Sequence, residues 1–303
     1  MDIDFVRTPE ERFQGLADFP FQPRYAEVGG LRVHYVDEGP RDAPVVLLMH
    51  GEPTWSYLYR RMIPVIAGAG FRAVAPDLVG FGRSDKPVKG SAYSYRQHVD
   101  WMTAWLEQLD LRRATLVGQD WGSLIGLRLA TGRQARFERI VMANGALPTG
   151  DEQFPRVFKL WRAFSRWSPW FPVGRIVQAG CRRPVTPEVR AAYEAPFPSA
   201  RFKAGARVFP SLVPMRPDDP ASDANRKAWR QLESWRKPFL CLYATGDPIT
   251  RAMYEVFRER VPGAAGQPHQ LIRGAGHFIQ EDAGEELARH IVEWLGPGAR
   301  GEP

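Results

Sequence analysis

The sequence predicts an α/β fold in which a mostly parallel β-sheet carries helices on both faces and a helical cap. Short apolar runs rich in β-branched residues alternate with helical patterns along most of the 303 residues, as in a parallel sheet with crossover helices. Several runs are continuously apolar, as strands buried on both faces require. The alternation stops after Asn144 and resumes near Phe239, so we expect an insertion between them.

The expected strands and helices follow one another in the order that such a sheet needs. Residues 31–35 alternate between apolar and polar side chains, whereas residues 44–49 form a continuous apolar run. Further strands are expected at residues 71–75, 114–117, 139–143, 239–243 and 270–273. Helices are expected at residues 55–67, 95–109, 122–132, 250–261 and 284–294. A length of 303 residues suits one α/β domain with an insertion.

The insertion is rich in Pro, Trp and Arg, and its apolar residues have helical spacing. Ligands of doubly wound sheets bind beyond the carboxyl ends of the strands, and an insertion of this kind lies above those ends. We therefore expect residues 148–223 to form a helical cap on a core of residues 1–147 and 224–303. The final GPGARGEP predicts a disordered tail.

The composition is that of a globular protein, with 44% hydrophobic and 25% charged residues. A net charge of +7 would permit binding to nucleic acid or anionic lipid. The basic residues are mostly Arg scattered among Asp and Glu, so we expect neither a nucleic-acid nor a membrane partner. We also expect a monomer.

The N-terminal residues lack the apolar core of a signal peptide, and no run approaches the roughly 18 apolar residues of a membrane span. These features predict a cytoplasmic location. The two cysteines, Cys181 and Cys241, suggest neither a disulfide framework nor a zinc site. Because no His, Cys and Asp cluster has metal-ligand spacing, we expect neither a metal nor another cofactor.

The segment VGQDWG at residues 117–122 lies between an expected strand and an expected helix. A nucleophile flanked by small residues two positions away forms the elbow of the α/β-hydrolases, where the turn is tight. Asp120 stands where a Ser is usual. A carboxylate is ionised at neutral pH and can attack a saturated carbon directly, which leaves an alkyl ester on the enzyme. The alternative is an Asp that only caps the next helix.

The segment HGEPTW at residues 50–55 follows the strand that ends at Met49. In this fold such a loop supplies one backbone N–H of an oxyanion hole, and the residue after the nucleophile supplies the other. The expected donors are therefore the N–H groups of Glu52 and Trp121. A plain strand-to-helix turn is the alternative.

The candidate base is His277, which follows the last expected strand in the position of the α/β-hydrolase histidine. An imidazole can take a proton from water at neutral pH, and a carboxylate must then orient it. Asp247 follows the first strand after the insertion, whereas the other usual position for the acid holds Asn144. The alternatives are a loop histidine and a turn aspartate before Pro248.

Four segments, HGEPTWSYLYR, DLVGFGRSDKP, GQDWG and GAGHFIQED, resemble the haloalkane dehalogenases, and the resemblance spans nearly the whole chain. It is greatest to the subfamily whose acid follows the strand after the cap. The resemblance implies hydrolysis of an apolar haloalkane to a primary alcohol, a halide ion and a proton. It also implies two tryptophans that bind the halide: Trp121 matches one and Trp161, by its position, the other. Trp167 and Trp170 are the alternatives for the second.

Three other functions are alternatives to haloalkane hydrolysis. Epoxide hydrolases share the Asp–His–Asp plan but use two cap tyrosines, and Tyr193 is the only tyrosine between Pro148 and Asp223. Fluoroacetate dehalogenases need Arg beside the nucleophile, where this chain has Trp121. A noncatalytic ligand receptor of this fold usually lacks one of the three catalytic residues, and all three are present here.

Overall fold

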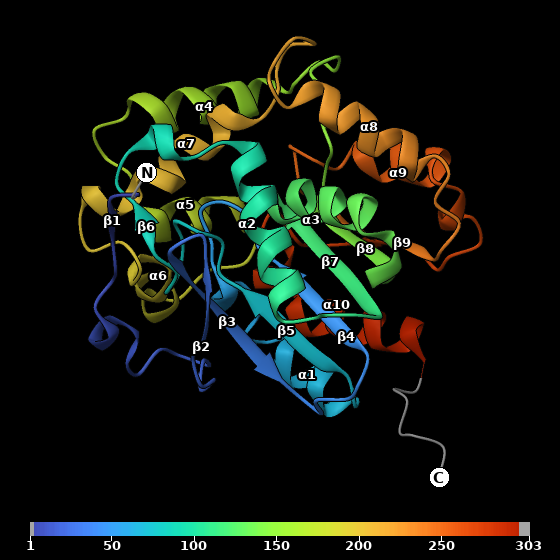
Figure 1. Ribbon diagram of the computed structural model, residues 1–303, viewed down its shortest axis with the longest axis horizontal. Coiled ribbons are helices and arrows are strands. Elements are labelled where there is room, and N and C mark those ends of the chain that lie inside the picture. The colour runs from blue at the N-terminus through green and yellow to red at the C-terminus, as the bar shows by residue number, and fades with distance from the viewer. Residues whose placement is uncertain (1–2, 297–303) are drawn as a thin grey trace.

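The structure, a computed structural model, describes residues 3–296 and confirms the α/β prediction (Figure 1). Apart from Gly296, the tail expected to be disordered lies outside the described residues. The strands are β1 (Phe5–Val6), β2 (Arg24–Val28), β3 (Leu31–Glu38), β4 (Val45–Met49), β5 (Arg72–Pro76), β6 (Lys86–Pro87), β7 (Ala114–Asp120), β8 (Phe137–Gly145), β9 (Phe239–Ala244) and β10 (Gln270–Ile272). The helices are α1 (Ile63–Gly68), α2 (Tyr95–Gln108), α3 (Trp121–Gly132), α4 (Arg156–Trp167), α5 (Val173–Gly180), α6 (Pro187–Glu194), α7 (Ala204–Leu212), α8 (Ser222–Leu232), α9 (Met253–Arg260) and α10 (Ile279–Leu295).

The main sheet has eight strands in the order β10-β9-β8-β7-β4-β5-β3-β2. From β10 to β5 neighbouring strands are parallel, and β3 is antiparallel to both β5 and β2. Every residue of β4 and β9 is buried, which is the reason for their continuous apolar sequences. Because β4, β7, β8 and β9 are parallel, their carboxyl ends lie at the same edge of the sheet.

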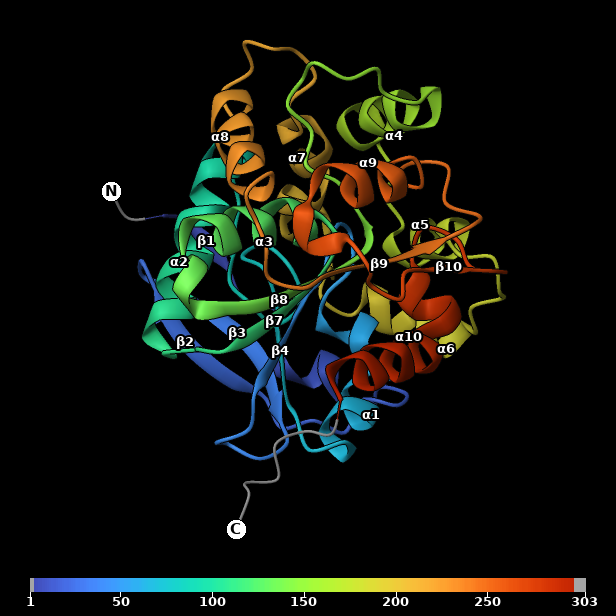
Figure 2. The ribbon, with the colours of Figure 1, turned by 90° about the vertical axis from the view of Figure 1, so that its right-hand side faces the viewer.

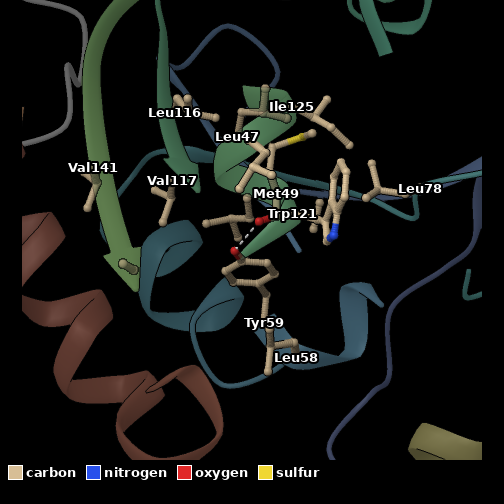
Figure 3. Close-up of a cluster of buried hydrophobic side chains, with 14 of the residues drawn as sticks. Leu47, Met49, Leu58, Tyr59, Leu78, Leu116, Val117, Trp121, Ile125 and Val141 are labelled. Carbon is tan, nitrogen blue, oxygen red and sulfur yellow. Dashed lines mark hydrogen bonds between the residues drawn. The ribbon is translucent and has the colours of Figure 1, made fainter. Parts of the chain in front are cut away.

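Helices cover both faces of the sheet (Figure 2). The α1 and α10 helices pack together on one face, and α2 and α3 pack on the other. The core between them includes Met49 of β4, Val117 of β7 and Ile125 of α3, all fully buried (Figure 3). The hydroxyl of Tyr59 donates a 2.8 Å hydrogen bond to the carbonyl of Met49 and fixes the chain just after β4.

Four helices, α4 to α7, follow β8 and precede α8 in the chain. The α4 and α7 helices lie above the sheet in both views, whereas α6 lies beside α10 (Figures 1 and 2). The α4 helix packs against α7, and α5 packs against α6. The α8 helix instead packs against α3. The segment expected to be helical is thus helical, and α4 lies at its outer edge in both views.

The structure differs from the expected elements in several places, of which two have a clear physical reason. The helix expected at residues 55–67 is a 3₁₀ turn at Ser56–Tyr59 followed by the short α1. Pro64 has no backbone N–H to bond the preceding turn, so it lies in the first turn of α1 rather than inside a longer helix. The β2 strand was not expected, because its sequence RYAEV is too polar to stand out beside the apolar strands.

None of the helices in the described part of the chain combines the length and the apolar character that crossing a membrane would demand.

Candidate functional site

Asp120 is the last residue of β7 and stands immediately before α3. Its φ of 48° lies in the left-handed region, which a non-glycine residue adopts only under tertiary constraint. A Cβ on Gly122 would lie 1.9 Å from the carbonyl oxygen of Met49, and one on Gly118 would lie 2.8 Å from Cα of Ser123. Glycine is therefore needed on both sides of this sharp turn, as the elbow motif predicts.

The turn aims the carboxylate of Asp120 at two partners. The backbone N–H of Glu52 donates a 2.8 Å hydrogen bond to its Oδ1 atom. Nε2 of His277 lies 3.5 Å from its Oδ2 atom. Trp121 begins α3, so its backbone N–H has no acceptor within the preceding turn of the helix. Of the two expected oxyanion donors, the N–H of Glu52 thus contacts the carboxylate, and the N–H of Trp121 belongs to the next residue of the chain.

His277 lies in the loop between β10 and α10 and contacts a second carboxylate. Its Nδ1 atom is 3.2 Å from both carboxylate oxygens of Asp247, which follows β9. Asp247 is buried and also accepts hydrogen bonds from the backbone of Ile249 and the hydroxyl of Thr250. Asp120, His277 and Asp247, which are far apart in the sequence, form one continuous chain of contacts.

The charges of the two aspartates control the pKa of the imidazole. Burial by itself lowers the pKa of His277, but the charge of Asp247 and the contacts with both aspartates raise it to about 10. For Asp247 burial acts in the opposite direction and raises the pKa. The neighbouring His277 together with the Thr250 hydroxyl nevertheless brings the pKa of Asp247 below its usual value. Each group thus stabilises the charged form of the other.

Two buried amides hold the backbone of His277. Nδ2 of Asn144 donates to the carbonyl oxygens of Gly276 (2.8 Å) and His277 (3.0 Å). Nε2 of Gln119 donates to the carbonyl of His277 at 3.2 Å. Oδ1 of Asn144 accepts from the N–H of Ala244 at 2.8 Å and so links β8 to β9. Sequence reasoning missed the role of both amides: Asn144 was considered only as a residue that cannot be the acid, and Gln119, next to Asp120, was not singled out.

His50 and His34 have structural surroundings. His50 is fully buried, with Nδ1 2.8 Å from the carbonyl of Gly51, and its Nε2 accepts from the N–H of Leu78 at 2.9 Å. Burial lowers the pKa of His50, which suits a neutral ring that shapes the loop before Glu52. His34 contacts Asp77 through a 2.7 Å hydrogen bond and is likewise buried.

The side chain of Glu52 is buried beside the candidate nucleophile. It is 4% exposed, and its Oε1 atom has no hydrogen-bond partner among the described residues. Burial and then the charge of Asp120 raise the pKa of Glu52 well above its usual value, while His277 and the nearby indole of Trp161 act in the opposite direction. A neutral carboxyl group in this position avoids placing a second negative charge against Asp120.

A cavity of about 540 Å³ lies over Asp120 and His277. Its walls are mostly apolar, and both Trp121 and Trp161 line it. Trp167 and Trp170 are 73% and 58% exposed, and neither lines this cavity. An indole N–H only donates hydrogen bonds, so two indoles in one cavity can surround an anion without offering it a competing acceptor.

Within residues 3–296, no group of three or more His, Cys, Asp or Glu side chains is arranged to hold a metal ion. The residues that line the cavity provide a carboxylate aimed at an apolar space, an imidazole beside it, and indole and backbone N–H donors.

Comparison with known proteins identifies similar enzymes. The family model of the α/β-hydrolase fold matches residues 44–284. A haloalkane dehalogenase from Mycobacterium marinum is 54% identical over 297 residues, which is 96% of this chain and 100% of that protein. Another from Psychrobacter cryohalolentis is 49% identical over 298 residues, covering 97% of this chain and 98% of the relative.

Among solved structures, the tetrameric haloalkane dehalogenase DpaA from Paraglaciecola agarilytica is 38% identical, with a TM-score of 0.89. The match covers 95% of this chain and 97% of DpaA. DbeA from Bradyrhizobium elkani, also a haloalkane dehalogenase, is 26% identical with a TM-score of 0.81, and the match covers 91% of this chain and 97% of DbeA.

Proposed function

This chain belongs to the haloalkane dehalogenases of the α/β-hydrolase fold, and from that premise we propose that Asp120 is its nucleophile, His277 its base and Asp247 its acid. The enzyme hydrolyses a haloalkane to an alcohol, a halide ion and a proton. The observation that carries the residue assignment is the unbroken contact chain from Asp120 through His277 to Asp247, beneath a largely apolar cavity.

In the first step, a carboxylate oxygen of Asp120 attacks the carbon that bears the halogen. A carbon–oxygen bond forms as the carbon–halogen bond breaks, and the electron pair of the broken bond leaves with the halide. The Oδ2 atom is the more available nucleophile, because Oδ1 accepts a 2.8 Å hydrogen bond from Glu52 whereas Oδ2 has only the looser, 3.5 Å contact with His277. The indole N–H groups of Trp121 and Trp161 bind the halide as its charge develops. We assign Trp161 rather than Trp167 or Trp170, since it lines the cavity.

In the second step, His277 takes a proton from a water molecule, whose oxygen attacks the carboxyl carbon of the Asp120 ester. The N–H groups of Glu52 and Trp121 stabilise the tetrahedral oxyanion. As it collapses, the bond between the carboxyl carbon and the alkoxy oxygen breaks, and that oxygen takes the proton held by His277 and leaves as the alcohol. The remaining proton of the water is released as the Asp120 carboxylate forms again. An ester at Asp120 carries no charge, so its formation removes one of the two charges that raise the pKa of His277. The lower pKa favours the neutral imidazole, which is the form that can take a proton from water in the second step.

Epoxide hydrolysis has less support. It requires an acidic group that faces the substrate, and the hydroxyl of Tyr193 instead donates a 2.7 Å hydrogen bond to Glu281. Tyr193 does not line the cavity. A noncatalytic receptor would have no need of the contacts that join Asp120, His277 and Asp247.

We further propose that residues 148–223 form a cap on a core of residues 1–147 and 224–303, with a small halogenated substrate bound between them. The packing of α8 on α3 supports a boundary near its first residue, Ser222. A cytoplasmic location and a monomeric state stay predictions, and one similar enzyme is described as tetrameric.

The assignment is tested with Asp120→Asn and His277→Phe, using 1,2-dibromoethane and 1-bromobutane. Asp120→Asn is expected to lower halide release by about 10³-fold or more while circular dichroism stays unchanged. His277→Phe is expected to stop after the first step and to gain the mass of the alkyl group. Wild-type turnover in Asp120→Asn, or multiple turnover without an adduct in His277→Phe, would contradict the respective role.

A further inference from the structure

The outer surface of α4 exposes large apolar side chains. Leu160 is 71% exposed and Trp167 73%, and Trp170, just beyond the helix, is 58% exposed. Leu160 and Trp167 are seven residues apart and therefore lie on the same side of the helix. We call these three residues, together with Lys159 and Arg166, the outer cap face. Exposed apolar area of this kind usually marks an interaction surface.

The segment that carries this face has basic but no acidic residues. Residues 153–187 contain no Asp or Glu. The seven basic residues in this segment are Arg156, Lys159, Arg162, Arg166, Arg175, Arg182 and Arg183. None of them forms an ion pair with a carboxylate in the part of the chain that the structure describes. In contrast, most basic residues of the core lie close to an acidic partner, for example Arg96 to Asp100 and Arg289 to Glu285.

Basic and aromatic groups are interleaved on the face. The guanidinium of Arg166 lies 4.8 Å from the ring centre of Trp167, and that of Arg175 lies 5.4 Å from the ring centre of Trp170. Lys159 and Arg166, seven residues apart, form a basic stripe beside the apolar one. Tryptophan favours the boundary between water and lipid, and helices with one apolar and one basic side lie in that boundary.

We propose that the outer cap face binds the surface of an anionic lipid bilayer, with α4 lying along it. A second copy of the chain is a less suitable partner, because a two-fold contact through this face would bring its unpaired basic residues against themselves. Anionic headgroups would neutralise those residues, and Leu160, Trp167 and Trp170 would enter the boundary of the acyl chains. The expectation of no membrane partner rests on the scattered charge of the whole chain and on the lack of a spanning segment. A helix that lies on the surface of a bilayer requires neither a strongly basic chain nor a spanning segment.

This arrangement would bring the cavity close to the lipid. Val157 and Phe164 line the cavity and are 41% and 37% exposed, so they lie at its mouth on the same helix. Apolar haloalkanes dissolve in bilayers, and the mouth would then open beside their reservoir. Only this consequence depends on the proposed function; the binding itself does not.

Flotation with vesicles tests the proposal. Wild-type protein is expected to bind vesicles of phosphatidylglycerol and phosphatidylcholine but not vesicles of phosphatidylcholine alone, and binding is expected to fall as salt rises. The double variants Trp167→Ser/Trp170→Ser and Lys159→Gln/Arg166→Gln are each expected to bind at least about tenfold less. The matched control is Arg96→Gln/Arg289→Gln, which removes two exposed charges from α2 and α10 and is expected to bind as wild type does.

Halide release in vesicle-free buffer shows that each variant is folded and separates this test from that of the proposed function. Equal binding to both kinds of vesicle, no binding to either, or unchanged binding by both face variants would overturn the proposal. So would a multimer that light scattering detects in the wild type and that dissociates in Trp167→Ser/Trp170→Ser without any vesicle binding. That result would assign the face to contacts between copies.

Discussion

At the scale of single residues, the charge of Asp120 contributes to the raised pKa of His277. His277 lies between two carboxylates, and only Asp120 changes its charge during the proposed reaction. The pKa of His277, raised to about 10 in the free enzyme, means that the ring is protonated at neutral pH and cannot act as a base at that stage. The ring can instead stabilise the reactive carboxylate until the substrate has been attacked.

Asp120→Asn imitates the neutral ester, because an amide has nearly the shape of a carboxylate without its charge. We predict that this substitution lowers the pKa of His277 below the value of about 10 in the wild type, since one of the contributions that raise it is removed. Titration of the imidazole signals by NMR measures both values. Asp110→Asn, a change on the exposed surface, is the control. Identical titration of His277 in wild type and Asp120→Asn would rule out the proposed coupling.

The sequence predicted the main catalytic candidates but not the residues that hold them. Asp120 ends β7, and Asp247 and His277 lie in the loops that follow β9 and β10, where local motifs point to them. Gln119 and Asn144 also stand at strand ends, but their function depends on reaching the backbone of a loop more than 130 residues away, with separations of 158 and 133 residues. No local pattern contains that information.

At the scale of secondary-structure elements, a buried carboxylate joins the proposed cap to the core. Glu281 of α10 accepts two hydrogen bonds from Arg60 at 2.8 and 2.7 Å, one from Arg61 at 2.5 Å, and one from the hydroxyl of Tyr193 on α6 at 2.7 Å. Burial raises the pKa of Glu281, but its partners bring it below the usual value. The charged carboxylate therefore has enough donors to remain ionised away from water.

Removing one donor from this cluster should weaken the attachment of α6. We predict that Tyr193→Phe lowers the free energy of unfolding by about 1.5–3 kcal/mol, the usual contribution of a hydrogen bond to a charged group. Tyr25→Phe is a matched control, because the Tyr25 hydroxyl also donates to a glutamate, Glu10, but at an exposed site. Urea titration measures both. An equal loss of unfolding free energy in the two variants would show that burial of the hydrogen bond to Glu281 does not increase its contribution to stability.

Strands were easier to predict than helix boundaries for a physical reason. A strand covered on both faces must be apolar throughout, so β4 and β9 can be recognised from their own residues. Besides Pro64, a distant group acts on the 3₁₀ turn that precedes α1: the N–H of Ser56, its first residue, donates to Asp77, 21 residues later, at 2.8 Å. Local helical spacing cannot show such a contact, and the expected single helix was therefore wrong.

At the scale of the whole molecule, buried groups that resist protonation should make the fold sensitive to acid. Burial lowers the pKa of His98 to about 3, and neither of its ring nitrogens has a partner among the described residues. Although burial by itself raises the pKa of Asp77, the contact with His34 and other hydrogen bonds lowers it to about 2. In the unfolded chain both groups would bind protons at higher pH, near 6.5 and 3.8.

Stability is lost wherever the unfolded chain binds more protons than the folded one, by up to about 1.4 kcal/mol per pH unit for each group. For His98 this window extends from pH 6.5 down to about 3, and for Asp77 from 3.8 down to about 2. We therefore predict that the melting temperature falls steadily from pH 6.5 to 3, and that His98→Gln flattens this decline because residue 98 no longer titrates. His290→Gln, at the surface of α10, should keep the wild-type slope. Parallel curves for wild type and His98→Gln across that range would show that the buried ring contributes nothing to the acid sensitivity.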